Sequence, residues 1–270
     1  MQGAVALTFR ADGGQTRLAD LHQRAPLRAL FPDEPATGIP TAVLLTTSGG
    51  MVGGDGFTVA VNAGETARAC VTTQAAEKIY RSLGADVRID VSLRAAADAW
   101  LEWMPQETIL FDASRLSRTT TVDLAPGARL LAGEILVFGR IARGERFRQG
   151  RLRDTWRISR AGRLLWHDAL ALEDDIPRLI DARAGFAGAA AAATVLYAGD
   201  DDPERHLPPL RALIAFDAVR SAATCVNGVL VVRGLAEDAR RLRDWLMRVW
   251  RSARAELAAL PPVLPRVWLT

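Results

Sequence analysis

Apolar and polar residues alternate with a period of two along most of the chain. This period is typical of β-strands with one buried face, because successive side chains point to opposite sides of a strand. Together with apolar runs that end at glycine or proline, it predicts strands over residues 5–10, 41–47, 57–61, 67–73, 87–93, 100–103, 108–111, 119–124, 128–138, 151–159 and 163–172. We therefore expect a mainly β fold of stacked sheets.

The pattern changes near the C-terminus. Pro208-Pro209 restricts any helix there to short pieces or to a start after the pair. Residues 228–233 are predicted to form a strand. From Leu235 to Leu257 apolar residues recur every three or four positions, which predicts an amphipathic helix of about six turns. Pro261-Pro262 is expected to end that helix.

No long flexible linker or fixed repeat interrupts the chain. We expect one domain over residues 1–270, with a β-rich part (1–200) followed by a helix–strand–helix part (201–270). The longest apolar stretch, residues 186–198, is shorter than the roughly 20 residues that a membrane span needs. The N-terminal residues lack the basic head and apolar run of a signal peptide. We expect a soluble, cytoplasmic protein.

The inventory of metal-binding side chains is small for 270 residues. Three histidines (His22, His167, His206) and two cysteines (Cys70, Cys225) lie far apart in the sequence. This spacing excludes a zinc ribbon, an HExxH protease and a CxxC redox centre, and no GxSxG motif occurs. We expect no tightly bound cofactor.

The net charge of +3 conceals two opposed stretches. Residues 140–163 hold nine arginines against two acids, whereas residues 168–181 hold five acids against one arginine. The basic stretch would attract nucleic acid. However, Arg151, Arg153 and Arg157 alternate with apolar residues, which indicates the solvated face of a hairpin. Opposed charges suit docking to proteins at least as well, and a nucleic-acid-binding protein remains an alternative.

Four glycines and an aspartate form a dense motif after the second predicted strand. Gly49, Gly50, Gly53, Gly54 and Asp55 lie within seven positions. Glycine-rich loops can surround phosphate, but here strands follow the loop and neither the P-loop nor the dinucleotide pattern fits. We interpret the motif as a tight turn in which several glycines take positive φ and Asp55 hydrogen-bonds its own turn.

Two further groups contain residue types used in catalysis. Lys78, the only lysine, lies close to Tyr80 and Arg81 after a predicted strand, and a buried lysine there would have a shifted pKa. Glu107 and Asp112 have the spacing of a possible carboxylate pair. We favour a solvated, mutually compensating charge patch of Glu77, Lys78 and Arg81 for the first group and surface carboxylates for the second. A small-molecule enzyme that uses Lys78, Tyr80 or the Glu107/Asp112 pair remains an alternative.

Five motifs taken together resemble one known family. They are GGMVGGD (49–55), TTQAAEKIYRS (72–82), LEWMPQETILF (101–111), LLAGEILVFGR (130–140) and PRVW (265–268). Their order and spacing resemble the urease accessory protein UreD family, called UreH in some organisms, along essentially the whole chain.

The resemblance implies a mainly β fold with two helices near the C-terminus and no enzymatic activity. It implies that the protein contacts the urease apoprotein and UreF, and through UreF the GTPase UreG, with neither nucleic acid nor membrane as a partner. Nickel(II) would pass in transit through a water-filled tunnel. Isolated oxygen or imidazole ligands suit such transfer because they bind a divalent ion weakly.

The resemblance also implies site residues. Asp55 matches the aspartate that closes the glycine motif, Glu134 matches an acidic position, and His167 and Asp168 fall where relatives usually have a carboxylate. These four are the expected nickel-path residues. The family motif is carried by Gly49, Gly50, Gly53, Gly54, Lys78, Tyr80, Arg81, Glu102, Pro105, Gln106 and Glu107. Gln74 and Glu77 depart from the family pattern.

Overall fold

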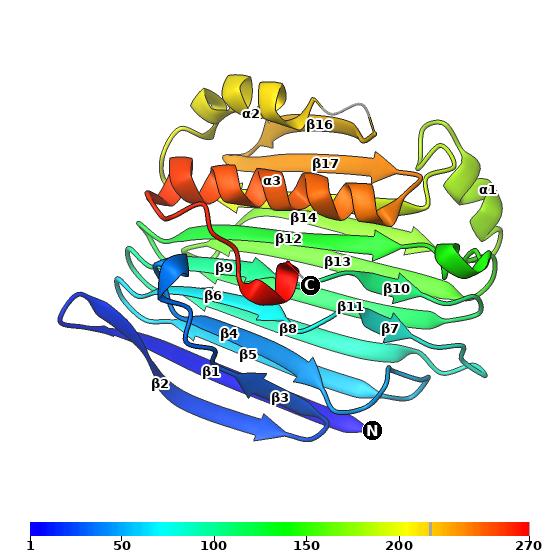
Figure 1. Ribbon diagram of the computed structural model, residues 1–270, viewed down its shortest axis with the longest axis horizontal. Coiled ribbons are helices and arrows are strands. Elements are labelled where there is room, and N and C mark those ends of the chain that lie inside the picture. The colour runs from blue at the N-terminus through cyan, green and yellow to red at the C-terminus, as the bar shows by residue number, and fades with distance from the viewer. Residues whose placement is uncertain (216–217, 270) are drawn as a thin grey trace.

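Two β-sheets stacked face to face form the body of the molecule (Figure 1). The computed structural model describes residues 1–215 and 218–269. Sheet A has the order β14 (Arg163–Leu172), β13 (Arg151–Arg160), β11 (Arg115–Leu124), β8 (Val87–Ala95), β5 (Gly56–Ala63), β1 (Gln2–Asp12), β2 (Gln15–Arg24). Sheet B has the order β16 (Arg220–Val226), β17 (Val229–Ala236), β15 (Ala191–Ala198), β12 (Arg129–Val137), β9 (Trp100–Met104), β6 (Arg68–Thr73), β4 (Thr41–Thr46), β3 (Leu27–Leu30), and β12 also carries β10 (Thr108–Leu110), which pairs with β7 (Glu77–Ile79).

The central strands are parallel within each sheet, and the chain crosses repeatedly from one sheet to the other. The strands β5, β8, β11 and β13 of sheet A alternate along the chain with β4, β6, β9 and β12 of sheet B. Each full turn of the chain, made of two crossings, therefore adds one strand to each sheet, as in a flattened coil. This arrangement confirms the prediction of a mainly β fold of stacked sheets.

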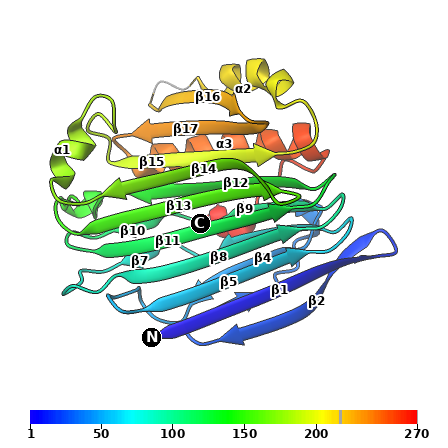
Figure 2. The ribbon, with the colours of Figure 1, turned by 180° about the vertical axis from the view of Figure 1, so that it is seen from behind.

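The period-two alternation of the sheet A strands corresponds to one buried and one wet face. Val59, Val91 and Thr120 occupy one row of neighbouring strands and point into the core between the sheets. The opposite face of sheet A faces the viewer in Figure 2 and carries alternate residues such as Asp90 and Arg157. One face of these strands contacts solvent and the other contacts the core, so polar and apolar residues alternate along them. This alternation made the strands predictable from the sequence.

Two helices, α2 (Leu207–Ile214) and α3 (Ala239–Ala258), lie on the other side of sheet B, whereas α1 (Ile176–Asp181) lies at one end of the sheets with Ile176 and Ile180 in the core between them (Figure 1). Short 3-10 turns are η1 (Pro35–Thr37), η2 (Ile141–Arg143), η3 (Pro203–His206) and η4 (Arg266–Trp268). The helix α3 lies across sheet B (Figure 1), and its Trp245, Leu246 and Trp250 are buried in a second core. Sheet B is thus buried on both faces, which explains the nearly continuous apolar run of β12.

The C-terminal part differs in two details from the expected helix–strand–helix order. A hairpin of β16 and β17 replaces the single strand. Leu235, the expected first residue of the long helical stripe, belongs to β17, where it pairs with Ala192 of β15. The helix begins only at Ala239, after the Asp238 carboxylate accepts a hydrogen bond from the Arg240 amide at 2.8 Å. Among the described residues, no helix combines the length and apolarity needed to span a bilayer.

Candidate functional site

A charged cluster lies inside the otherwise apolar core between the sheets. Arg118 donates from Nε to Oδ1 of Asp154 at 3.0 Å, and its Nη2 contacts both Oδ2 of Asp154 and Oε2 of Glu134. Its Nη1 donates to the Thr108 hydroxyl at 3.2 Å. We call Arg118, Glu134 and Asp154 the core charge cluster. All three side chains are buried, so contacts within the protein replace their contacts with water.

Both sheets contribute to this cluster. Arg118 and Asp154 are direct partners in the parallel ladder of β11 and β13. Glu134 comes from β12 in the facing sheet, and its neighbours Ala132 and Leu136 on the same side of that strand belong to the core between the sheets. One guanidinium therefore joins a carboxylate from each sheet.

Two cavities meet at the core charge cluster. The larger, about 310 Å³, is lined by Glu134 and Asp154 together with Asp168. The smaller, about 40 Å³, is lined by Glu134 and Arg118 together with Glu77. Because Glu134 lines both cavities, the cluster forms the wall between them.

Burial changes the acid–base properties of these groups. Burial raises the pKa of Glu134 to about 8, Asp154 adds to the rise, and Arg118 opposes it. Burial also raises the pKa of Glu77, again opposed by Arg118. For Arg118, burial lowers the pKa, but the neighbouring carboxylates outweigh this effect and the pKa is raised overall. The guanidinium therefore stays charged, whereas Glu134 retains a proton more readily than an exposed glutamate.

The raised pKa of Glu134 predicts a dependence of stability on pH. Between about pH 5 and pH 8 the folded protein holds a proton on Glu134 that the unfolded chain has released. The free energy of unfolding should therefore fall as pH rises through this window, by on the order of 1 kcal/mol or more. Urea denaturation of Glu134→Gln and wild type at both ends of the window measures this. We expect a flatter profile for the variant, and parallel profiles would contradict the assignment.

Asp168 lines the same cavity as Glu134. Its carboxylate pairs with Arg233 of β17, so this ion pair connects the two sheets. His167 is exposed and, as the preceding residue of β14, points to the other face of the strand, where it is in register with Arg157. The structure thus brings Glu134 and Asp168 together and leaves His167 outside their cavity.

Asp55 lies away from this cavity, in the turn that its glycines form. Its Oδ2 accepts a hydrogen bond from the Val52 amide at 2.9 Å, which confirms the predicted turn contact, and its Oδ1 pairs with the amine of Met1. The prediction of positive φ at several motif glycines is wrong, because only Gly54 has one, at 91°. Gly50 is required by close packing instead, since a Cβ atom there would lie 2.6 Å from the Tyr80 ring.

The segment around Lys78 is a surface strand and turn. Lys78 and Arg81 are exposed, and the Tyr80 hydroxyl donates to the Gly49 carbonyl at 2.6 Å. The motif residues Lys78, Tyr80 and Gly49 therefore belong to one loop junction. The predicted solvated patch is wrong for Glu77, which alternates with Lys78 on β7 and lines the smaller cavity.

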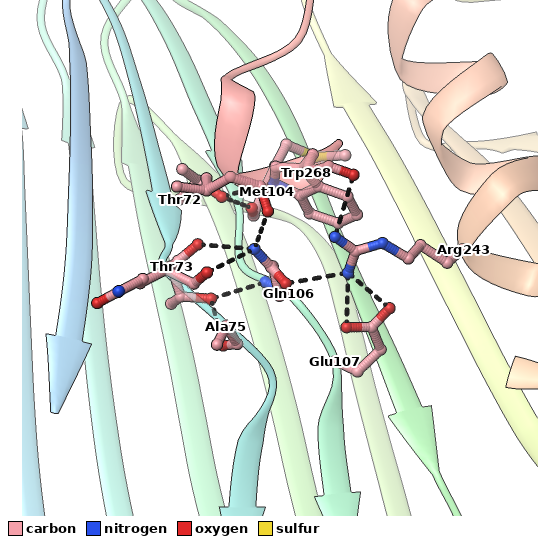
Figure 3. A network of polar contacts seen from close by, with 10 residues as sticks. Thr72, Thr73, Ala75, Met104, Gln106, Glu107, Arg243 and Trp268 are labelled. Carbon is pink, nitrogen blue, oxygen red and sulfur yellow. Dashed lines mark hydrogen bonds and ion pairs between the residues drawn. The ribbon is translucent and has the colours of Figure 1, made fainter. Parts of the chain in front are cut away.

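Gln106 and Glu107 anchor the C-terminal segment (Figure 3). The Gln106 side-chain amide donates to the Val267 carbonyl at 2.8 Å, and Arg243 of α3 donates to both Glu107 oxygens at 2.9 and 3.0 Å. Arg243 also donates to the Trp268 carbonyl at 3.1 Å. The family motif of residues 101–111, which contains Pro105, Gln106 and Glu107, therefore connects sheet B, helix α3 and the C-terminal segment.

The possible catalytic pair Glu107 and Asp112 has separate partners. Glu107 is held by Arg243, whereas Oδ1 of Asp112 accepts from the amides of Arg148 and Gln149 at 2.8 and 2.9 Å. Each carboxylate thus stabilises its own local structure.

The arginines of β13 lie as the alternation predicted. Arg153 and Arg157 are exposed on the outer face of sheet A, while Trp156 points into the core. Arg151 and Arg153 both pair with Glu173. These contacts confirm that the basic stretch contributes the solvated face of a hairpin.

Sequence reasoning missed Arg118 and Asp154. A signal was present, since Asp154 lies between the apolar residues Leu152 and Trp156 at inward positions, where a charge is unexpected. Within residues 1–215 and 218–269, no group of three or more histidine, cysteine, aspartate or glutamate side chains is arranged to hold a metal ion.

Comparisons with known proteins agree along the chain. A protein-family model described as "UreD urease accessory protein" matches residues 1–269. A protein of Magnetococcus marinus named urease accessory protein UreD is 45% identical, over 99% of this chain and 94% of its own. Proteins with the same name are 44% identical in a Methylobacterium species, over 100% and 95%, and 43% identical in Azorhizobium caulinodans, over 98% and 95%.

Proposed function

The chain belongs to the UreD family of urease accessory proteins and has a role in urease maturation, and we propose that it fills this role by conducting nickel(II) toward apo-urease through the space between its two sheets. The protein acts in this proposal as a non-catalytic scaffold in the cytoplasm. UreF and the urease apoprotein are its direct partners, and UreG joins through UreF. Nickel is cargo in this proposal, not a resident cofactor.

The observation that carries the proposal is the row of carboxylates along the cavity between the sheets. Asp168 lines the larger cavity and forms a half-exposed ion pair with Arg233. Glu134 and Asp154 line the buried inner wall of this cavity, and Glu77 lines the smaller cavity on the other side of Glu134. Oxygen ligands that are spread along a path suit a borderline divalent ion in transit, because each holds the ion weakly and exchanges with water.

The proposal assigns a step to each carboxylate. Asp168 receives the ion near the surface, and Glu134 passes it between the two cavities, which it lines on both sides. The raised pKa of Glu134 means that an arriving cation displaces a proton there, so binding to this residue stays weak. Asp55 remains a predicted transit residue of a separate surface, where it lines a polar hollow of about 540 Å³ with Arg115.

Urease activation by the Glu134→Gln variant tests the proposal. Glutamine keeps the size of the side chain and removes the negative charge. We expect urease activity to fall at least about tenfold in cells that supply the other accessory proteins, while the variant still co-purifies with UreF and urease.

Asp123→Asn is the matched control, because Asp123 is an exposed carboxylate on the outer face of β11. It should leave activation unchanged. If urease is loaded with nickel normally in cells that carry Glu134→Gln, while the complexes still form, the proposed route is wrong. Failure of the wild-type chain to form any complex with UreF would count against the scaffold role.

A further inference from the structure

Arg118 occupies the point at which the two carboxylates of the core charge cluster converge. Oε2 of Glu134 and Oδ2 of Asp154 contact the same nitrogen atom, Nη2 of Arg118. Asp154 is also bound through Oδ1, so the guanidinium holds this carboxylate with two parallel hydrogen bonds. Such forked pairs fix both position and orientation.

The same convergence is what a divalent ion requires. Two carboxylate oxygens that meet at one buried point provide ligands for a cation whose remaining positions can be filled by water. The adjoining cavities of about 310 and 40 Å³ provide space for that water on each side. Without Arg118, the buried pair would have no counterion, so a cation that displaces the Glu134 proton could bind both carboxyl groups.

We propose that Arg118 is an internal counterion that stands in for the metal between Glu134 and Asp154 and must be displaced when nickel(II) passes, so that this carboxylate pair conducts the ion and does not store it. Arg118 is thus a positioning residue, and this inference rests on the proposed function. It explains how two buried carboxylates can face one cavity without forming a resident metal site.

Glu77 offers the displaced guanidinium a second partner. Arg118 and Glu77 line the same small cavity and interact electrostatically. When an ion arrives from the larger cavity, movement of the Arg118 head group toward Glu77 keeps the guanidinium paired while both oxygens become available. Glu77 is one of the residues that depart from the family pattern, and this role gives its charge a function.

Removal of the counterion should convert the chain into a nickel-binding protein. We expect the purified Arg118→Met variant to bind Ni²⁺ about tenfold or more tightly than wild type in calorimetric titration, with correspondingly slower release to a chelator. Co²⁺ should give visible absorption bands on binding to the variant. Arg118→Lys keeps a positive charge and should stay near wild type.

Arg157→Met is the matched control, since Arg157 is an exposed arginine on the outer face of the neighbouring strand β13. Arg118→Gln provides a second neutral variant whose amide can still donate to the carboxylates. If either neutral variant is unfolded, Ni²⁺ should restore its fold. Ni²⁺ affinity equal to that of Arg157→Met in both variants, or no refolding with excess Ni²⁺, overturns the proposal.

The Ni²⁺ titration of the Arg118 variants and the urease-activation test of Glu134→Gln can fail separately. Tight Ni²⁺ binding by Arg118→Met, combined with normal urease activation by Glu134→Gln, would retain the counterion relation and reject the route. Unchanged Ni²⁺ affinity with lost activation by Glu134→Gln would reject the role of Arg118 alone. Arg118→Lys with the same gain in affinity as Arg118→Met would show that the charge is not what matters, which also overturns the proposal.

Discussion

Arg254→Met should lower the free energy of unfolding by about 3–5 kcal/mol. Arg254 of helix α3 and Glu102 of β9 are fully buried and form an ion pair at 2.5 Å. In the variant, Glu102 would keep hydrogen bonds from the indole N–H groups of Trp100 and Trp250, at 2.8 and 2.7 Å, and its contact with the Cys70 thiol, but it would lose the guanidinium. Hydrogen bonds cannot replace a lost counterion for a carboxylate in this surrounding, so the buried charge becomes costly.

Urea denaturation measures this loss. The control is Arg241→Met, an exposed arginine of the same helix, which should change the free energy of unfolding by less than about 0.5 kcal/mol. The double variant Arg254→Met/Glu102→Gln should recover part of the stability, because it removes the unpaired charge. A loss below about 1 kcal/mol in the single variant would show that the pair does not hold α3 on the sheet.

Trp268→Ala should lower the free energy of unfolding by a similar amount, about 3–5 kcal/mol. The indole is 1% exposed and donates to the Thr72 hydroxyl at 2.8 Å. It packs edge-on against Trp250, with 5.4 Å between ring centroids, and the Arg243 guanidinium lies 4.6 Å from its centre. Truncation leaves a large cavity between α3 and sheet B and removes the hydrogen bond that the Thr72 hydroxyl accepts, although this hydroxyl still donates to the Met104 carbonyl at 2.6 Å.

Thermal and urea unfolding of Trp268→Ala test this prediction. Leu269→Ala is the matched control, since that neighbouring side chain is 59% exposed and its removal should have little effect. Limited proteolysis adds a local measurement, because the segment around Trp268 should become the first site of cleavage. Equal stability of the two variants would contradict the anchoring role of Trp268.

The strands of sheet A could be predicted because one of their faces is wet. Residues 87–93 alternate clearly, and β8 occupies Val87–Ala95. The strand β2 was missed because nearly all of its side chains are exposed, so no apolar period exists. The strand β15 was missed because it is an alanine-rich run buried against both cores, for which periodicity gives no signal.

The candidate site was predictable in part. The family resemblance selected Glu134 and Asp168, and the structure places them in one cavity. Arg118 and Asp154 could be noticed as charges at inward positions, but their pairing depends on the register of β11 and β13. Glu134 meets them from the facing sheet, and neither register nor sheet packing is encoded in the local pattern of residues.

The anchored C-terminus has a consequence for how the chain folds during synthesis. The contact of Trp268 with Thr72 spans 196 residues, and that of Arg254 with Glu102 spans 152. Contacts so distant in sequence cannot form until Arg254 and Trp268 have left the ribosome, and they slow folding because a long loop must close first. Until then, the face of sheet B that α3 later covers stays exposed, so the nascent chain passes through an aggregation-prone stage that lasts until both residues have emerged.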